Sequence, residues 1–242
     1  MLGPQHLAIW DHATATRPAH RGCVMVWGFA DSLAASPTDV AAWPVGDRER
    51  VLLETQRAAF GNMLELQAPC PACAETAAFS VEIDALLAVP PANAWPLRVV
   101  VDDLVLECRR PSTMDLDDAW RLSPDPVTAR LRLFRACVRL RTQAGEAVHT
   151  DAVGEAVIAA AAAALGEADP QADIRFSLIC PACSQSWETL FDPGLTFWRR
   201  FDSWARGWFD DVQRLSLAYG WSERDILAMH PARRRMYLDA AS

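Results

Sequence analysis

The spacing of apolar residues changes along the chain, and each period predicts a different kind of element. Over residues 1–62 the apolar positions follow helical spacing, as at Val51 and Thr55. Asp47 is a suitable cap for the beginning of the last of these helices, and Gly61 is suitably placed to end it. We therefore predict a helical N-terminal region over residues 1–62.

Two short stretches alternate apolar and polar residues, and each of them surrounds the same four letters, CPAC. Alternation with a period of two on both sides of a tight turn is typical of a β-hairpin. The first hairpin is predicted at residues 63–84 and the second at residues 174–192. The chain therefore contains one unit, strand–CPAC–strand, twice.

A long insertion, residues 85–173, separates the two hairpins. Apolar alternation on both sides of Asp102 and Asp103 predicts a strand pair, or one long strand, within residues 95–110. Three helices are predicted after it, at residues 115–122, 127–140 and 151–165, the last of them on its alanine content. We expect this insertion to form an α/β subdomain.

The clearest helical pattern lies in residues 193–242. Its apolar residues return at steps of three or four and form one stripe, made of Phe197, Phe201, Trp204, Trp208, Val212 and Leu215. Gly220 is expected to end this helix, Ser222 to cap a second one, and Pro231 to permit a third. We predict a C-terminal helical arm over these residues.

The two CPAC units bring the strongest chemical signal. Each places two thiolates on one knuckle, and two knuckles supply the four sulfur ligands that structural zinc prefers. The predicted ligands are Cys70, Cys73, Cys180 and Cys183. Pairing of the two hairpins would close a zinc ribbon, although the 106 residues between Cys73 and Cys180 exceed the usual ribbon spacing. The expected fold is therefore mainly helical α+β, with a zinc ribbon built from two distant CPAC hairpins.

Two other interpretations of the cysteines stay open. One is a redox motif, but both CPAC units precede strands, so they lack the helix N-terminus that lowers a thiol pKa. The other is two unrelated buried pairs. Four thiolates around zinc leave no open position, so the predicted zinc is structural. Cys23, Cys108 and Cys137 lie among apolar neighbours and are expected in the core.

Charge and composition narrow the classes of function. The net charge of −8 argues against nucleic-acid binding, which needs a basic surface. All 23 cationic residues are arginine, which excludes a Schiff-base or phosphate-binding lysine. The longest apolar tract, residues 156–165, is too short to span a bilayer, and the first ten residues do not read as a signal peptide. We expect a cytoplasmic protein with reduced thiols and no membrane partner.

No catalytic motif is present in the sequence. It contains no GxSxG, HExxH or phosphate-binding loop, and its 11 glycines make a nucleotide cradle improbable. The paired aspartates are adjacent in sequence and point to different faces, so they form no acid–base dyad. We therefore expect a protein that is not an enzyme and has no small-molecule substrate.

Several segments, taken in order, resemble one family. They are the stretch AWPVGDR at residues 42–48, Phe60-Gly61 and Leu64-Glu65 before the first CPAC, RRPST at residues 109–113 with Asp115-Leu116, Trp187 and Phe191-Asp192 after the second CPAC, and in the tail LAYGWSE at residues 217–223, Asp225 to Leu227, Arg233-Arg234 and Tyr237-Leu238. Together they resemble the baseplate hub assembly chaperones of contractile-tailed, T-even-type phages and related contractile injection systems. Ala74, where a glycine often follows the knuckle, and Met229-His230-Pro231 depart from the pattern.

The resemblance implies assistance in building a tail baseplate, with baseplate or tail-hub subunits as partners, and it carries the four cysteines over as zinc ligands. The arm would bind the partner through residues of its aromatic stripe and tail: Trp204, Trp208, Trp221, Arg233, Arg234 and Tyr237. Core packing of the stripe and a solvated arginine face are the alternatives. A thiol–disulfide oxidoreductase and a zinc-ribbon nucleic-acid adaptor remain the other candidate functions. Retention in the finished particle is left open.

Overall fold

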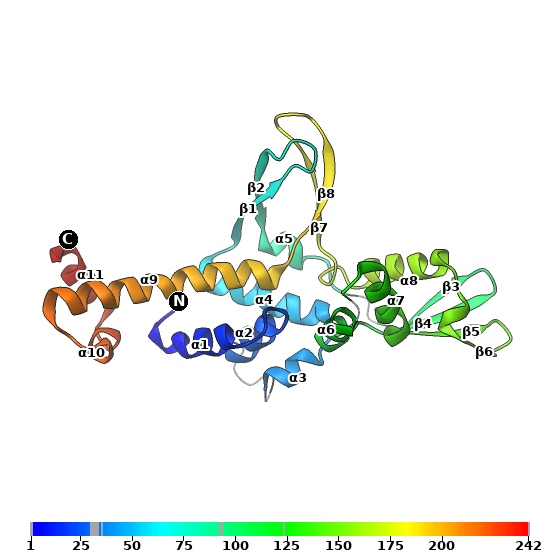
Figure 1. Cartoon of the computed structure of the whole chain (residues 1–242), viewed down its shortest axis with the longest axis horizontal. Coiled ribbons are helices and arrows are strands. Elements are labelled where there is room, and N and C mark those ends of the chain that lie inside the picture. Colours follow the sequence, from blue (N-terminus) through cyan, green and yellow to red (C-terminus); the bar gives the residue numbers. More distant parts are fainter. Residues whose placement is uncertain (1, 30–33, 35, 92–93, 123, 242) are drawn as a thin grey trace.

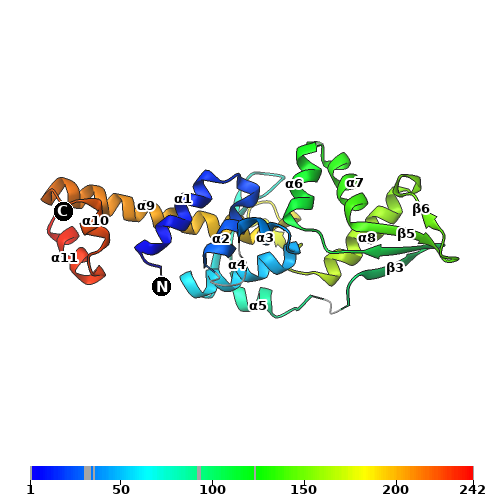
Figure 2. The same cartoon turned by 90° about the horizontal axis from the view of Figure 1, so that it is seen from below.

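The computed structural model describes residues 2–29, 34, 36–91, 94–122 and 124–241; the end residues 1 and 242 of the predicted regions lie outside them. The fold is of the predicted mixed α+β class and is 56% helical, with small sheets. A helical body lies at the centre, and two β-hairpins project from it (Figures 1 and 2). A lobe with a four-stranded sheet extends from one end of the body and a helical arm from the other.

The helical body joins the two ends of the sequence. It consists of α1 (Leu7–Ala15), α2 (Arg21–Phe29), α3 (Pro37–Ala41), α4 (Val45–Phe60) and the first half of α9 (Pro193–Tyr219), with 3-10 turns at Pro4–His6 and Pro18–His20. Phe197 and Phe201, one turn apart on α9, are fully buried against α2 and α4 together with Cys23. Residues 193–208 of the predicted arm therefore belong to the body.

The prediction for α4 was correct at its end and three residues late at its beginning, because the predicted cap was Asp47 and the observed cap is Pro44. The helix begins at Val45, directly after Pro44, so Asp47 lies in the first turn and is not the cap. A carboxylate in the first turn still interacts favourably with the helix dipole. Gly61 ends the helix at a φ of 91°, a conformation that costs other residues strain.

Both predicted hairpins are present. The strands are β1 (Met63–Pro69) and β2 (Thr76–Glu82), then β7 (Arg175–Ile179) and β8 (Ser186–Leu190), all antiparallel within their pairs. The expected pairing of one hairpin with the other was wrong, because within the described chain they form two separate two-stranded sheets. They contact each other through side chains instead, and Phe79 meets Phe176 with ring centroids 5.3 Å apart.

The base of the hairpins is tied to the body by a small apolar cluster. Short helix α5 (Ile83–Leu87) follows β2, and its Ile83 is buried with Leu53 of α4 and Leu64 of β1. Ile174 and Phe191 join from the second hairpin. Both hairpins therefore stand on the same part of α4.

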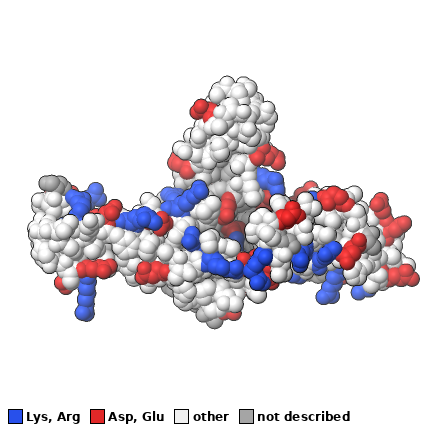
Figure 3. Space-filling model, viewed as in Figure 1, with Lys and Arg blue, Asp and Glu red and all other residues white. Residues whose placement is uncertain are grey.

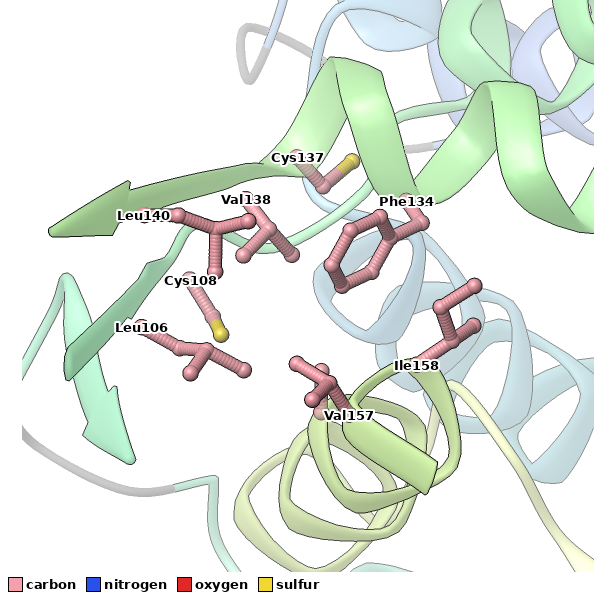
Figure 4. Close-up of a cluster of buried hydrophobic side chains, with 9 residues drawn as sticks. Leu106, Cys108, Phe134, Cys137, Val138, Leu140, Val157 and Ile158 are labelled. Carbon is pink, nitrogen blue, oxygen red and sulfur yellow. The ribbon is translucent and has the colours of Figure 1, made fainter. Parts of the chain in front are cut away.

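The lobe packs helices against one face of a sheet. Its strands are β3 (Leu97–Val101), β4 (Leu104–Cys108), β5 (Val138–Thr142) and β6 (Ala147–Val148), and its helices are α6 (Thr113–Leu122), α7 (Pro126–Cys137) and α8 (Glu155–Ala168), with a 3-10 turn at Thr150–Ala152. Figure 4 shows Leu106 of β4, Phe134 of α7 and Val157 of α8 pointing into one core. The predicted strand pair around Asp102 is confirmed as β3 and β4.

Two helix predictions in the lobe were wrong at their ends. The helix predicted for residues 127–140 ends at Cys137, and residues 138–142 form β5 instead. Val138 and Leu140 pair with Cys108 and Leu106 of β4, and burial of this alternating face overrides the helical propensity of the segment. The helix predicted for residues 151–165 begins four residues later and ends three residues later, as α8.

A buried ion pair joins the lobe to the body. Arg110 donates to Asp47 at 2.6 and 2.8 Å and to Asp169 at 2.7 and 3.0 Å. The side chains of Arg110 and Asp169 are only 11% and 2% exposed. The main chain meets there too, since Val45 N–H donates to the carbonyl of Pro111 at 2.8 Å. Arg110, Asp47 and Asp169 form what we call the junction. It holds the root of the lobe against the body.

The second half of α9 extends away from the body and carries two further helices. As predicted, Gly220 ends α9 in a left-handed conformation and Ser222 caps α10 (Glu223–Leu227) through the backbone N–H of Asp225. Helix α11 (Pro231–Ala240) then folds back along α9. None of the helices in the described residues is long and apolar enough to cross a membrane.

Candidate metal centre

The two CPAC units fold into knuckles with the same backbone geometry. Cys70 N–H donates to the carbonyl of Glu75 at 2.8 Å, and Ala74 N–H donates back to the carbonyl of Cys70 at 2.9 Å. The second knuckle repeats both bonds between Cys180, Ser184 and Gln185, at 2.9 and 3.0 Å. The strands of each hairpin thus hold both cysteines of their knuckle at the tip.

Each knuckle needs one residue in the left-handed region. Ala74 has a φ of 62° and Ser184 a φ of 60°. A side chain at such a position costs roughly 1–2 kcal/mol, which explains why glycine suits it. The chain accepts this local conformational cost in both knuckles.

The tips of the two hairpins bring the four predicted cysteines together. Sγ of Cys70 lies 3.7 Å from Sγ of Cys183, and Sγ of Cys73 lies 3.6 Å from Sγ of Cys180. All four sulfurs lie within 4.8 Å of one another, and each cysteine is free of a disulfide. Residues that are 107 to 113 positions apart in the sequence thus form one compact sulfur cluster.

This geometry fits a tetrahedral metal ion. Four sulfurs at the zinc–sulfur distance of about 2.3 Å stand about 3.8 Å from one another at the corners of a tetrahedron. The measured 3.6 and 3.7 Å agree with that spacing and exceed a disulfide bond by far. The cluster could therefore hold a metal ion, and soft thiolates favour zinc among the common ones.

Backbone groups favour the ionised form of one ligand. The N–H of Cys183, together with that of Ala182, outweighs desolvation and lowers the pKa of the Cys180 thiol to about 7.

Cys70 and Cys180 are buried between the hairpins, whereas Cys73 and Cys183 are exposed at the tip. The cluster thus has a protected inner side and an outer side at the surface.

The three other cysteines lie in the core, as predicted. Cys23 and Cys108 are fully buried, and Cys137 is 5% exposed. Burial raises the pKa of the Cys108 and Cys137 thiols to about 11. Burial thus favours the protonated form of the Cys108 and Cys137 thiols.

The predicted partner-binding residues of α9 lie inside the protein's own packing. Trp204 stacks on Phe201 with centroids 5.4 Å apart and is half-buried. Trp208 is 7% exposed and is covered by Arg234, whose guanidinium carbon lies 3.4 Å from the ring centroid. These three side chains stabilise the arm and offer little surface to a partner.

The remaining predicted residues lie at the far end of the arm. Trp221 stacks on Tyr219 at 4.6 Å and meets the edge of Tyr237 at 4.7 Å. Arg233 is exposed on α11. Arg233 is therefore the predicted contact residue with the most accessible side chain, next to a cluster of three half-exposed aromatic rings.

Sequence reasoning missed the junction between lobe and body. Asp47 and Arg110 lie inside the stretches that resemble the family. They are 63 residues apart, and nothing in the sequence indicated that they would form an ion pair. Asp169 follows α8 without any motif. The local signal for this ion pair would have been the opposite charges of Asp47 and Arg110 in the stretches at residues 42–48 and 109–113.

Comparison with known proteins gives no match, whether with family models, with curated proteins or with solved structures. The family resemblance of the sequence therefore remains a proposal.

Proposed function

We propose that this protein is a non-enzymatic assembly chaperone or adaptor for the baseplate of a contractile phage tail or tail-like injection system. It acts in the cytoplasm, carries one structural zinc ion, and binds baseplate or tail-hub subunits. Nucleic acid, membrane and small-molecule substrates have no part in this function.

The observation that carries the proposal is the convergence of the family-like stretches. The stretch at residues 42–48 meets the stretch at residues 109–113 through the Val45–Pro111 backbone bond and a bridge between Pro44 and Ser112. Tail residues Tyr219, Trp221 and Tyr237 form one aromatic cluster. Contact between these stretches is what a shared fold requires, and it supports the proposal.

Zinc would have a clear structural task here. The hairpins share no backbone ladder, and their mutual contacts are the facing apolar side chains and the sulfur cluster. Bound zinc would join the two thiolates of one hairpin to the two thiolates of the other at the outer end. The result is the zinc ribbon of the proposal, built from two distant parts of the chain and rigid enough to present a surface.

Co-expression with the baseplate and tail-hub subunits of the same genome tests the proposal. The wild-type chain is expected to form a complex of fixed stoichiometry with one of these subunits, measured by native mass spectrometry together with its zinc content. Arg233→Glu on α11 should weaken that complex about tenfold, as loss of a well-placed charge contact does. The matched control is Arg98→Glu on β3, at the opposite end of the molecule (Figure 1).

Other outcomes would replace the proposal. A metal-free chain whose CPAC thiols form a reversible disulfide would indicate an oxidoreductase. Salt-sensitive binding to DNA or RNA would indicate a nucleic-acid adaptor. A zinc-loaded chain that binds none of the tail subunits would contradict the assembly function itself.

A further inference from the structure

A groove runs along the outer edge of β1, between the hairpins and the beginning of α9. Its volume is about 490 Å³, within the range of peptide and ligand sites. One wall is the continuous run Met63–Ala68 of β1, and the end of β8 with Phe191 directly after it forms the other. Phe79 and Phe176 contribute the apolar floor.

Within the described residues, the edge of β1 that borders this groove pairs with no other strand. Cys70 N–H donates to the carbonyl of Glu75, and Ile83 N–H donates to the carbonyl of Asn62. The backbone N–H and C=O groups of the even-numbered residues of β1 therefore point towards β2. The alternation of an antiparallel ladder then turns the N–H and C=O groups of Met63, Glu65 and Gln67 away from β2. Arg200, which lines the groove, lies 3.5 Å from the Met63 carbonyl and thus marks the side to which they point.

Strand β1 contains a single charged residue, Glu65, and its outer half lacks the charges that normally protect exposed strands. Between Leu66 and Val81 the only charged residue is Glu75, and residues 176–187 contain none. Figure 3 shows the hairpin projection as a largely uncharged surface above the charged body and lobe. An unprotected edge of this kind is a template for pairing with a further strand.

The groove is lined by two arginines and two carboxylates, so its formal charges balance. Its two carboxylates have partners, since Glu65 accepts from Ser80 Oγ at 2.7 Å and Asp192 caps α9 through Leu195 N–H at 2.8 Å. Arg200 bonds only backbone carbonyls and lies over the Phe60 ring, at 4.7 Å from its centroid. Arg199 is exposed and forms no ion pair within the described residues. Two guanidinium groups are therefore available to a carboxylate.

We propose that the groove binds an extended segment of a partner protein, which adds a strand to the free edge of β1. Alternate apolar side chains of the segment pack on Phe79 and Phe176, and an aspartate or glutamate at one end binds Arg199 and Arg200. This rests on the proposed function and deepens it, because it names the surface by which the hairpins hold a baseplate subunit. Backbone pairing supplies affinity in such complexes, and the side-chain positions supply specificity.

Peptide selection on the full chain tests the geometry without knowledge of the partner. The probe is a random ten-residue library displayed with both ends linked, and selected sequences are then synthesised with blocked termini. The expected consensus alternates apolar residues and ends in an acidic one. Dissociation constants are measured by fluorescence anisotropy.

Two proline variants provide a matched pair. Gln67 and Ala78 are directly opposite in the β1–β2 register, and their N–H groups point to opposite edges. Gln67→Pro removes the donor that faces the groove and should weaken a selected peptide about tenfold, the value of one or two lost hydrogen bonds. Ala78→Pro makes the same change on the far edge and should leave affinity within about twofold. Equal zinc content and melting temperature in both variants establish that each is folded.

A charge reversal tests the other half of the proposal. Arg199→Glu should weaken the same peptide about tenfold, whereas Arg224→Glu on α10 should have no effect. Equal affinity in Gln67→Pro and Ala78→Pro, or selection of sequences without an acidic residue, would overturn the groove. If Gln67→Pro still captures the tail subunit at full strength, the groove fails and the assembly function stands. If peptides bind but no tail subunit does, the groove stands and the assembly function fails.

Discussion

At the scale of single residues, the four thiols of the sulfur cluster act as one unit. Replacing Cys180 with serine removes a buried ligand and leaves three thiolates around a metal that prefers four. Because ligand binding and folding are coupled in such sites, zinc should fall from about one per chain to about zero. The hairpins should lose their protection against proteolysis, while the circular dichroism of the helical body remains.

The control for this change is Cys137→Ser, in the core of the lobe. It removes a thiol of the same chemistry that lies 5% exposed and far from the cluster. It should cost about 1–3 kcal/mol of stability through a buried hydroxyl and leave the zinc content unchanged. Full zinc content in Cys180→Ser, measured by elemental analysis, would show that the cluster does not bind as proposed.

Asp115 makes stability depend on pH at the root of the lobe. Desolvation raises the pKa of its carboxyl, but bonds from Arg109 at 2.7 and 2.8 Å and from Ser112 outweigh it, so the pKa falls to about 2. The pKa in the unfolded chain is about 3.9, so the folded state holds the carboxylate more tightly. This contribution of about 2 kcal/mol is present above pH 4 and lost as the pH falls towards 2.

Asp115→Asn should therefore destabilise the protein by about 2 kcal/mol at pH 6 and by much less near pH 2. Urea unfolding at both pH values measures the difference. Asp118→Asn removes an exposed carboxylate from the same helix, paired only with Arg121 at 3.0 Å, and should change stability by less than about 0.5 kcal/mol. A loss of equal size at both pH values would assign the effect of Asp115 to the hydrogen-bonded cap and not to its charge.

At the scale of elements, the N-terminus of α4 is fixed by a close approach that only glycine permits. A Cβ on Gly46 would overlap the carboxylate of Asp169. Gly46→Ala should therefore cost about 1–3 kcal/mol, although alanine is the better helix former. Gly207→Ala, in the middle of α9 with open space around it, should instead stabilise by about 0.5–1 kcal/mol. Opposite signs in urea unfolding confirm the contact, and two stabilising changes would refute it.

Elements with strong local signals could be predicted from the sequence. The apolar stripe and Gly220 defined α9, and the alternation around both CPAC units defined the four hairpin strands. Strand β5 could not be predicted, because residues 138–142 continue the apolar spacing of α7 and become a strand only by pairing with β4. The helical pattern of residues 127–140 competed there with strand pairing to β4, and burial of Val138 and Leu140 favoured the strand.

At the scale of the whole molecule, the sequence could place the four cysteines together but not the cores around them. Equal spacing in the two knuckles was enough to predict one sulfur cluster across a 106-residue insertion. It carried no information on which helices the arm would cover. Phe197 and Trp208 were therefore predicted as parts of an arm, and both are buried: Phe197 against α2 and α4, and Trp208 beside Leu7.

The separate cores predict that the lobe and the zinc-binding end respond to different mutations. The core of the lobe contains residues 97–165 only, and the cluster at the base of the hairpins contains none of them. The junction of Arg110 with Asp47 and Asp169 connects the lobe to the body on which the hairpins stand. Arg110→Met keeps the length of the side chain near Trp95 but leaves Asp169 as a buried carboxylate without its partner. Such a change costs about 3–5 kcal/mol.

Hydrogen exchange measured by mass spectrometry can locate that loss. In Arg110→Met the amides of β4, β5 and α8 should exchange faster, because the root of the lobe opens, while the hairpins keep their protection and about one zinc per chain. Arg139→Met changes an exposed arginine of β5 and should leave both regions as in the wild type. If Arg110→Met instead released zinc or accelerated exchange evenly across all described elements, the body, lobe and hairpins would be one cooperative unit. The hairpins would then be too tightly coupled to the lobe to serve a partner independently of it.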